Sequence, residues 1–162
     1  MTPEYARFLY GLVGGAWFWV DRLSWTRDQW AAEIGVPGTE FHVLYGGGLP
    51  LGFVQLQPLA HADADGERTE VEIRYFGLAE NAIGQRLGGV LLEQALDAAW
   101  AIGRRAGLSP VTRVWVHTCT LDGPRALANY QARGLVPCHV EETDEQIPEE
   151  ALGAWASTGG PD

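Results

Sequence analysis

Basic residues are scarce in this sequence, which has 11 lysine and arginine residues against 21 aspartate and glutamate residues and a formal net charge of −10. Nucleic-acid binding needs a basic surface because the phosphate backbone is anionic, so this deficit argues against DNA or RNA as a partner. The surplus of acid favours a cationic partner instead. We therefore expect an amine, on a small molecule or on a protein.

Long apolar runs are also missing. The longest early uncharged run, residues 8–20, is interrupted by glycines and is too short to cross a bilayer. It lacks the basic flank and cleavage site of a signal peptide. We expect a cytoplasmic protein that does not bind a membrane.

Cysteine is limited to Cys119 and Cys138, which form no C-x-x-C pair and have no four-ligand zinc set near them. Both are expected to be buried, reduced thiols. A nucleophilic Cys119 activated by His117 stays open as an alternative. Residues 61–69 are predicted to form a polar loop and not a metal site, since the spacing of an EF-hand is absent.

The composition, with 46% hydrophobic and 20% charged residues in 162, is that of one globular domain spanning residues 1–162. Its core is expected over residues 40–140, followed by an acidic tail with a short helix over 141–162. Hydrophobic periodicity and turn residues predict helices over residues 3–13, 26–35, 87–102 and 121–135, and strands over 41–45, 49–57, 70–78, 111–120 and 136–140.

The stretch from residue 70 to residue 100 organises the chain. Its pattern changes from the alternation of a strand to the 3.6-residue period of a helix across residues 84–89. A helix N-terminus carries unpaired N–H groups and a positive dipole end, which suits an anion such as a pyrophosphate. Gly84, Gly88 and Gly89 have no side chain to block the approach. Taken alone, this pattern fits a tight structural turn equally well.

A second motif follows, because Ala126, Tyr130 and Gly134 recur at intervals of four in a predicted helix. Together with the loop Ile83-Gly84-Gln85-Arg86-Leu87-Gly88, this order resembles the GNAT superfamily of acyl-CoA-dependent N-acetyltransferases. The run WVHTCTLD before the helix is similar to small bacterial acetyltransferase-like proteins of that superfamily.

The resemblance implies a mixed α+β (α/β) fold with a mostly antiparallel central sheet flanked by helices. It implies acetyl-CoA as co-substrate, no metal, and transfer of the acetyl group to a primary amine by direct attack. A homodimer is one assembly that we consider. A non-catalytic acyl-CoA sensor and a donor with a longer acyl chain are the alternatives.

The resemblance also implies which residues contact the cofactor. The pantetheine arm would pair with the backbone of Phe76, Gly77 and Leu78. The pyrophosphate would bind to the loop of Ile83, Gly84, Gln85, Arg86, Leu87, Gly88 and Gly89. This loop departs from the R/Q-x-x-G-x-G/A pattern of the family, with Ile83 at the usual Arg/Gln position and Arg86 at the usual first Gly.

Two residues are predicted to be catalytic. Tyr130 is the candidate general acid, because a phenol with an ordinary pKa of about 10 is protonated at neutral pH and can donate to the leaving thiolate. Glu72 is the candidate base. Its alternative is a strand residue that faces solvent or pairs with Arg74 or Arg113, and Asp21 and His117 are reserve bases.

The aromatic segment of residues 16–25 has two interpretations. Its rings either pack the first helices onto the sheet or line the acceptor pocket, and different rings can do each. Trp17, Trp19, Asp21 and Trp25 are the candidate acceptor-binding residues.

Overall fold

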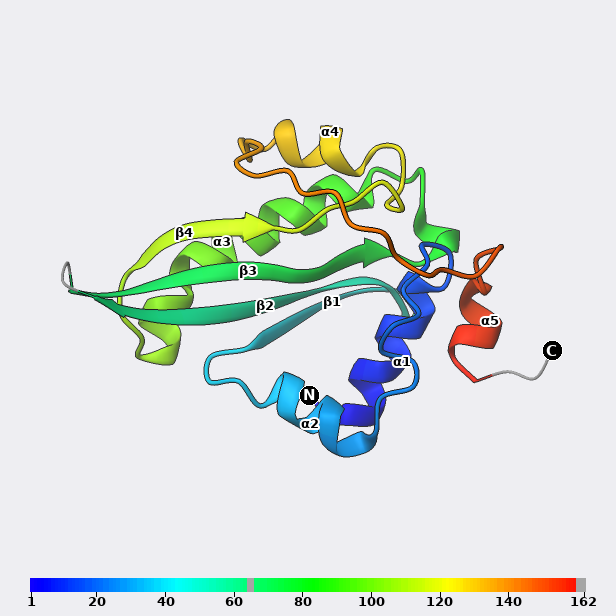
Figure 1. Cartoon of the computed structure of the whole chain (residues 1–162), viewed down its shortest axis with the longest axis horizontal. Coiled ribbons are helices and arrows are strands. Elements are labelled where there is room, and N and C mark those ends of the chain that lie inside the picture. The colour runs from blue at the N-terminus through cyan, green and yellow to red at the C-terminus, as the bar shows by residue number, and fades with distance from the viewer. Residues whose placement is uncertain (64–65, 160–162) are drawn as a thin grey trace.

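The computed structural model describes residues 1–63 and 66–159. Its sheet has four strands in the order β1-β2-β3-β4 (Figure 1). They are β1 (Glu40–Gly46), β2 (Leu49–Asp63), β3 (Gly66–Leu78) and β4 (Val111–Val116). β1, β2 and β3 pair in antiparallel fashion, whereas β4 runs parallel to β3. The prediction of a mixed, mostly antiparallel sheet is confirmed.

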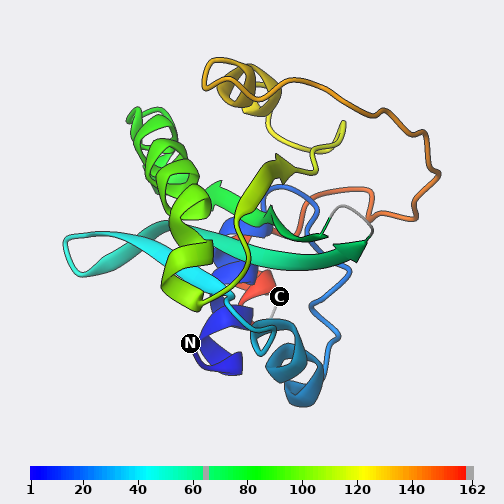
Figure 2. The ribbon, with the colours of Figure 1, turned by 90° about the vertical axis from the view of Figure 1, so that its left-hand side faces the viewer.

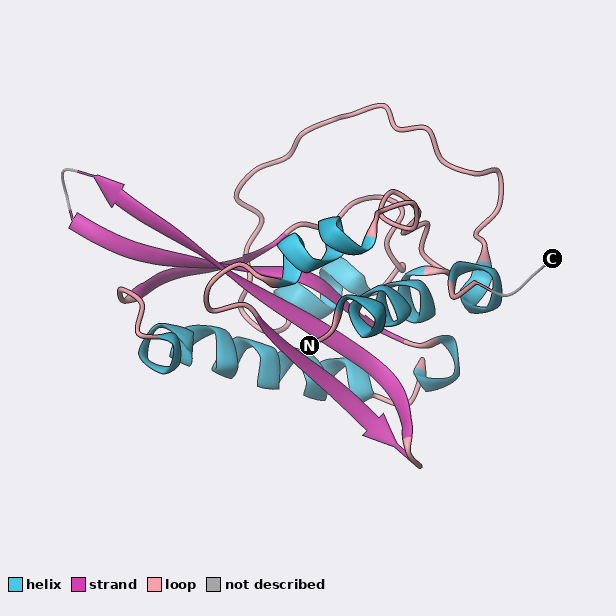
Figure 3. Cartoon of the chain, turned by 90° about the horizontal axis from the view of Figure 1, so that it is seen from below, coloured by secondary structure: helices cyan, strands magenta, loops and turns pink. Residues whose placement is uncertain are grey.

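Helices lie on both faces of this sheet (Figure 3). They are α1 (Pro3–Gly14), α2 (Arg27–Ile34), the short 3-10 helix η1 (Glu80–Ala82), α3 (Leu87–Ala106), α4 (Ala126–Gln131) and α5 (Gly153–Ser157). Thr26 caps α2 in a capping box with Gln29. α3 packs across β2, β3 and β4, and α1 packs on β2 and β3.

The two faces of the sheet bury different side chains. Toward α3 the core is aliphatic, with the strand residues Leu56, Val71 and Ile73 against small and branched residues of the helix. Toward α1 it is aromatic and includes Tyr10, Trp30, Phe53 and Tyr75. The pairing of β3 with β4 ends at Ile73 and Val116, whereas its pairing with β2 continues to Leu78. Beyond these residues β3 and β4 therefore separate, and we call this opening the fork (Figure 1).

A β-bulge lies where the fork begins. Gln55 pairs with Tyr75 and Leu56 pairs with Ile73, so Arg74 is the extra residue of β3. A bulge bends its strand and increases the local twist. The bulge thus helps β3 to diverge from β4.

The prediction of a polar loop over residues 61–69 is wrong for most of that stretch. β2 and β3 continue as the arms of a hairpin, in which His61 pairs with Arg68. Antiparallel pairing satisfies the backbone of both arms even where both faces are exposed, so polar composition does not end the strands. Ala64 and Asp65 lie outside the described residues.

The strand predicted over 111–120 ends at Val116, and the helix predicted over 121–135 is reduced to the six residues of α4. The reason lies in Asp122, a residue type that often caps a helix N-terminus. Its carboxylate instead accepts hydrogen bonds from the Thr118 hydroxyl at 2.6 Å and the Cys119 amide at 3.2 Å. This turn stops the strand early and delays the helix.

The strand predicted over 136–140 does not form. Residues 135–152 contain no helix or strand and arch from α4 to α5 (Figure 3). Val136 and Val140 are 80% and 83% exposed, and Pro137 has no N–H to donate to a ladder. Cys119 and Cys138 are exposed free thiols, so the prediction that they are buried is also wrong.

The acidic tail carries the predicted short helix, but this helix is not simply solvated. α5 packs on α1, and the Gly153 amide donates to the Gly15 carbonyl at 2.9 Å. A β-carbon at Gly11 would lie 2.5 Å from the Ser157 carbonyl oxygen, so glycine permits this contact. Within the described ranges, no helix has the length and apolarity that crossing a bilayer requires.

Candidate active site

The end of β3 presents backbone groups to the fork. Phe76, Gly77 and Leu78 pair with β2 on one side, opposite Val54, Phe53 and Gly52. Past Ile73 the other edge of β3 has left β4. An extended chain can add to such an edge as a further strand.

The loop after β3 leads into the N-terminus of α3. No side chain caps this helix. In the part of the chain that the structure describes, no amide from Gly84 to Gly89 donates a backbone hydrogen bond outside the regular elements. The first N–H groups of a helix have no partner within it. These amides are therefore available to an anion, and the dipole favours one.

Arg86 shows why the family pattern has glycine at its position. It is the residue before α3 and has φ 63° and ψ 9°, in the left-handed region that disfavours residues with a β-carbon. At Gly88 a β-carbon would lie 3.6 Å from Leu78 Cδ1, an ordinary contact. This spacing agrees with the tolerance of the pattern for Gly or Ala there.

Gly89 has a different neighbour from the one predicted. The Arg133 guanidinium occupies the space that a side chain at Gly89 would fill. Arg133 donates to the Gly89 carbonyl at 3.1 Å and forms an ion pair with Glu93 at 3.1 Å. Its Nη1 also donates to Asn129 Oδ1 at 2.6 Å. Arg133 therefore fastens α4 to the first turns of α3, and the two lie side by side in Figure 2.

This contact places Tyr130 close to the end of β3. Tyr130 is 5% exposed, and its ring lies 5.9 Å from that of Phe76 between centroids. Burial raises the pKa of the Tyr130 phenol well above its usual range, and the nearby Asp122 carboxylate adds to this shift. The phenol is therefore protonated at neutral pH.

Glu72 lies on the other face of the sheet from Tyr130, one residue before the fork. It is 7% exposed, and its direct cross-strand neighbours are Gln57 and Trp115. Of the two arginines considered from sequence, Arg74 pairs with Glu72 at 3.3 Å. Arg113 pairs with Glu70 instead, also at 3.3 Å. Glu72 is thus buried and paired, and it does not face open solvent.

The rings of the aromatic segment of residues 16–25 differ in their surroundings, because some pack in the core and others do not. Trp19 packs on Tyr10 at 5.4 Å and on Tyr75 at 5.5 Å between ring centroids, which makes it a packing residue. Trp17 reaches across to the β4–α4 turn, where a β-carbon at Gly123 would lie 3.0 Å from its ring.

The other two candidates of that segment are engaged within it. Trp25 packs edge-on against Trp30 at 5.5 Å and lies beneath the Arg22 guanidinium at 4.9 Å. The Asp21 carboxylate accepts from the Tyr10 hydroxyl and pairs with Arg22 at 2.8 Å. Trp17 is therefore the candidate ring that contacts the β4–α4 turn.

Several buried polar atoms on the face of the sheet toward α1 and α2 have no partner within the described residues. They are Gln55 Oε1, the Tyr75 hydroxyl and Trp115 Nε1. Unpaired buried polar atoms are rare in folded proteins because each costs desolvation energy. Gln55 faces Tyr75 across the strands, and Glu72 faces Trp115, so these groups are adjacent on one surface.

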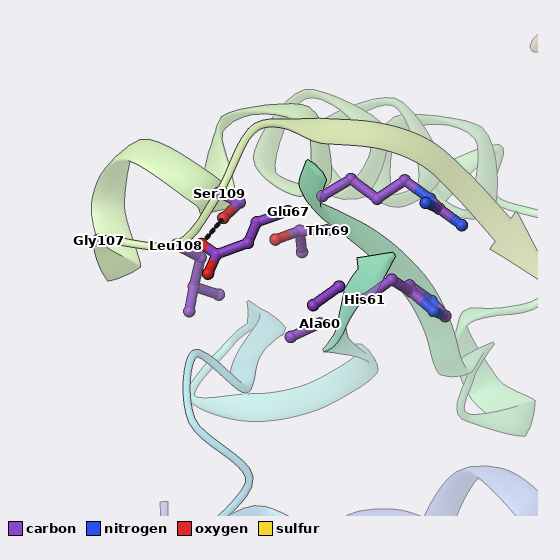
Figure 4. A pocket seen from close by; sticks show the side chains of 9 residues that line it. Ala60, His61, Glu67, Thr69, Gly107, Leu108 and Ser109 are labelled. Atoms are coloured by element: carbon purple, nitrogen blue, oxygen red, sulfur yellow. Dashed lines mark hydrogen bonds between the residues drawn. The ribbon is translucent and has the colours of Figure 1, made fainter. Parts of the chain in front are cut away.

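Two hollows lie elsewhere. One of about 310 Å³ is lined by the far ends of β2 and β3 and by the α3–β4 turn, including Thr69, Leu108 and Ser109 (Figure 4). Another of about 260 Å³ lies between α1, the start of β2, η1 and α5. No group of three His, Cys, Asp or Glu side chains in the described ranges could hold a metal ion.

Sequence reasoning missed Arg133 and Glu33 as parts of this region, although it considered Arg74 as a partner of Glu72. Arg133 lies one helical turn after Tyr130, a spacing that could have suggested a link to α3. Glu33 of α2 pairs with Arg74 at 2.9 Å. No local pattern indicates that pairing, because the two residues come from elements that are distant in sequence.

Comparisons with known proteins give a consistent result. A model of the Acetyltransferase (GNAT) family matches residues 6–135. No curated protein matches the chain. An aminoglycoside acetyltransferase from an uncultured soil metagenomic sample is similar in structure, with a TM-score of 0.62 and 17% identity over 91% of this chain and 95% of that one.

Two further structures share the fold. An acetyltransferase of Trypanosoma brucei has a TM-score of 0.55 and 16% identity, over 74% of this chain and 77% of its own. A transcriptional regulator from Bacillus halodurans C-125 has a TM-score of 0.53 and 18% identity, over 74% and 76%. The family match spans more than half of the sequence and agrees with the fork, the open N-terminus of α3 and the position of Tyr130, so this chain belongs to the GNAT acetyltransferase family.

Proposed function

We propose that this protein is an acetyl-CoA-dependent N-acetyltransferase that acts on a primary amine. One observation supports this most strongly: the end of β3, the start of α3 and the Tyr130 helix adjoin one another at the fork. Phe76 contacts Tyr130, and Arg133 joins α4 to Gly89. Backbone donors for a long ligand and a protonated phenol thus lie together.

The residues fit the cofactor as follows. The amides of residues 84–89 would hold the pyrophosphate, and Arg86 would add a charge-assisted contact. The free edge at residues 76–78 would pair with the pantetheine arm, and one amide there would stabilise the oxyanion. Acetyl-CoA supplies the acetyl group as an activated thioester.

The two predicted catalytic side chains have complementary roles. Glu72 would take the proton that the attacking amine loses, directly or through water. Tyr130 would give its proton to the thiolate as the bond between carbon and sulfur breaks. The phenol and the carboxylate lie on opposite faces of the sheet, so the reacting atoms would lie in the fork between them.

The acceptor would approach from the face toward α1 and α2. The polar side chains on that face, from Gln55 to Trp115, would bind its hydrogen-bonding groups, and Trp17 would border the opening. The aminoglycoside acetyltransferase of similar fold suggests polyfunctional amines as the first compounds to test. A single chain is the proposed folding unit, and a homodimer is the proposed assembly.

Cofactor binding is tested by thermal unfolding with acetyl-CoA, CoA and longer acyl-CoAs. A ligand at a hundredfold excess over its Kd adds about 2.7 kcal/mol of stability, which corresponds to several degrees in Tm. No stabilisation by any of these compounds at millimolar concentration would contradict the proposal. A larger shift with a longer acyl chain would identify a different donor.

Turnover is tested with a panel of amines. The chain contains no lysine, so acetylated side-chain amines in a protein acceptor cannot come from the enzyme itself. Cys119 and Cys138 are exposed and would react with a thiol reagent. Product is therefore measured by mass spectrometry, or by thiol release with a Cys119→Ser/Cys138→Ser variant. Binding of acetyl-CoA without turnover on any amine would indicate a sensor.

A further inference from the structure

Glu72 belongs to a cluster of charges that links β3 to α2. The bulge at Arg74 lets both Arg74 and Tyr75 lie on the face of the sheet toward α1 and α2, which is also the face of Glu72. Glu33 reaches this face from the last turn of α2. A carboxylate from a helix, a guanidinium and a strand carboxylate therefore stand in a row.

The guanidinium of Arg74 is shared unequally. Its Nε donates to Glu33 Oε1 at 2.9 Å, whereas its Nη1 lies 3.4 and 3.3 Å from the two oxygens of Glu72. Both carboxylate side chains are 9% exposed and that of Arg74 is 28% exposed. The shorter bond goes to Glu33, and no other hydrogen bond to the Glu72 carboxylate occurs in the described part of the chain.

The position of Glu33 does not serve the stability of its own helix. A carboxylate in the last turn of a helix is opposed by the dipole, which favours cations there. α2 has no basic residue in its last turn to offset this. Glu33 is therefore held by Arg74 at 2.9 Å and, over a longer distance of 3.4 Å, by Gln55 Nε2. The pair of Glu33 and Arg74 fixes the guanidinium at a set distance from Glu72.

The remaining groups near Glu72 complete its charge environment. Tyr75 on β3 and the pair of Asp21 and Arg22 in the α1–α2 loop border the same cluster. Gln57 on β2 and Trp115 on β4 are uncharged. Farther along, Glu70 and Arg113 pair with each other. The Arg74 guanidinium thus pairs with two buried carboxylates, those of Glu33 and Glu72.

We propose that Glu33 is a positioning residue for Glu72 and acts through Arg74. By taking the shorter bond, Glu33 keeps the guanidinium from moving closer to Glu72 than the present 3.4 and 3.3 Å. This leaves Glu72 oriented but able to accept a proton. The inference rests on the proposed function of Glu72 as the base.

Opposite changes in the pH profile are expected from removing the two partners. In Glu33→Gln the Arg74 guanidinium pairs with Glu72 alone. This pairing keeps the Glu72 carboxylate ionised to lower pH and occupies its oxygens. In Arg74→Gln two buried carboxylates face each other without a cation, which favours protonation. The acidic limb of kcat/KM should move to lower pH in Glu33→Gln and to higher pH in Arg74→Gln.

The experiment measures kcat/KM against pH for both variants and the wild type, with the one amine of the panel that is acetylated fastest. Ionisation of that amine is common to all samples, so differences report the protein. On the acidic limb the two variants should differ by at least about tenfold, as opposite charges within a few ångströms of a carboxylate produce. The plateau value of kcat should also fall in Glu33→Gln.

Controls separate position from folding. Glu40→Gln breaks a comparable ion pair, that with Arg105 at 2.6 Å, and should leave the limb in place. Glu33→Asp and Arg74→Lys keep the charges and should restore most of the profile if the glutamine variants fold poorly. The proposal would be overturned if the acidic limbs of kcat/KM coincide, or move in the same direction, in the two folded glutamine variants.

The proposed function is checked separately with Glu72→Gln. If that variant keeps the wild-type rate, the assignment of the base is wrong. In that case titration of the Glu72 carboxyl carbon by ¹³C NMR still shows whether Glu33 acts on Glu72 through Arg74. If Glu72→Gln is inactive and the two limbs do not separate, the base stands and the inference about Glu33 fails.

Discussion

The two faces of β3 differ in how completely their buried groups are satisfied. Toward α3, Val71 and Ile73 pack against Leu92 in a mostly aliphatic core that also includes the ring of Tyr130. Toward α1 and α2, Gln55 is fully buried and its Oε1 has no partner among the described residues. The first face supplies stability, and the second keeps polar groups in a low-dielectric setting where a ligand could pair with them.

This contrast gives a reason for the division of roles that we propose. Tyr130 comes from the well-packed side, where its ring is held by Phe76 and its helix by Arg133. Glu72 comes from the polar side, where an acceptor amine can be bound. A fixed acid and a polar acceptor surface on opposite sides of one opening is an arrangement suited to group transfer.

The largest expected effect tests the acid on the α3 side. Tyr130→Phe should lower kcat by about 10²–10⁴-fold, since it removes the proton donor while the ring still packs. The thermal shift with acetyl-CoA should be retained. Steady-state kinetics measures kcat, and thermal unfolding measures the shift with acetyl-CoA.

Tyr10→Phe is the matched control for that substitution, because Tyr10 is a buried tyrosine of the aromatic cluster. Its hydroxyl bonds Asp21, so stability should fall by about 1 kcal/mol while kcat changes little. Equal loss of kcat in both variants would mean that packing, and not proton donation, explains the effect.

The next effect tests the apolar face. Leu92 is fully buried against the sheet, so Leu92→Ala should lower the free energy of unfolding by about 2–5 kcal/mol through lost burial and a residual cavity. Leu127→Ala, at a residue that is 49% exposed, should change it by no more than about 0.5 kcal/mol. Urea unfolding gives both values, and similar losses would contradict the assignment of the core.

A smaller effect of opposite sign is expected on the polar face. Gln55→Leu removes a buried oxygen without a partner but also the hydrogen bond from Gln55 Nε2 to Glu33 Oε1 at 3.4 Å, so the net stabilisation should be no more than about 1 kcal/mol. The KM of an acceptor amine should rise, because a group that we assign to its binding is lost. Gln94→Leu on the exposed side of α3 is the control. A Gln55→Leu variant that is less stable would show that the lost hydrogen bond to Glu33 outweighs the removal of the unpaired oxygen.

The smallest effect tests the strained residue before α3. Arg86→Gly should raise stability by about 0.5–1 kcal/mol, because relief of the left-handed backbone exceeds the added entropy of glycine in the unfolded chain. Arg104→Gly, within the same helix, should instead cost about 1 kcal/mol. If Arg86 contacts the pyrophosphate, Arg86→Gly also weakens acetyl-CoA binding, and more so at low salt.

Local sequence signals were reliable where the chemistry is local. The capping box of Thr26 and Gln29 and the change of period into α3 each depend on neighbouring residues. The boundaries that failed depend on partners elsewhere. Residues 136–140 have the composition of a strand but no strand to pair with, and Asp122 bonds the preceding turn instead of capping α4.

By itself, the sequence determined the family, the order of most elements, the helix that carries Tyr130 and the loop that precedes α3. These follow from periodicity, caps and motif spacing, which act over a few residues. Only the tertiary structure decided that Arg74 is divided between Glu33 and Glu72, that Gly89 makes room for Arg133, and that Trp19 belongs to the core. Those contacts join segments that are distant in the chain, and no local pattern specifies which of several charged or aromatic side chains will meet.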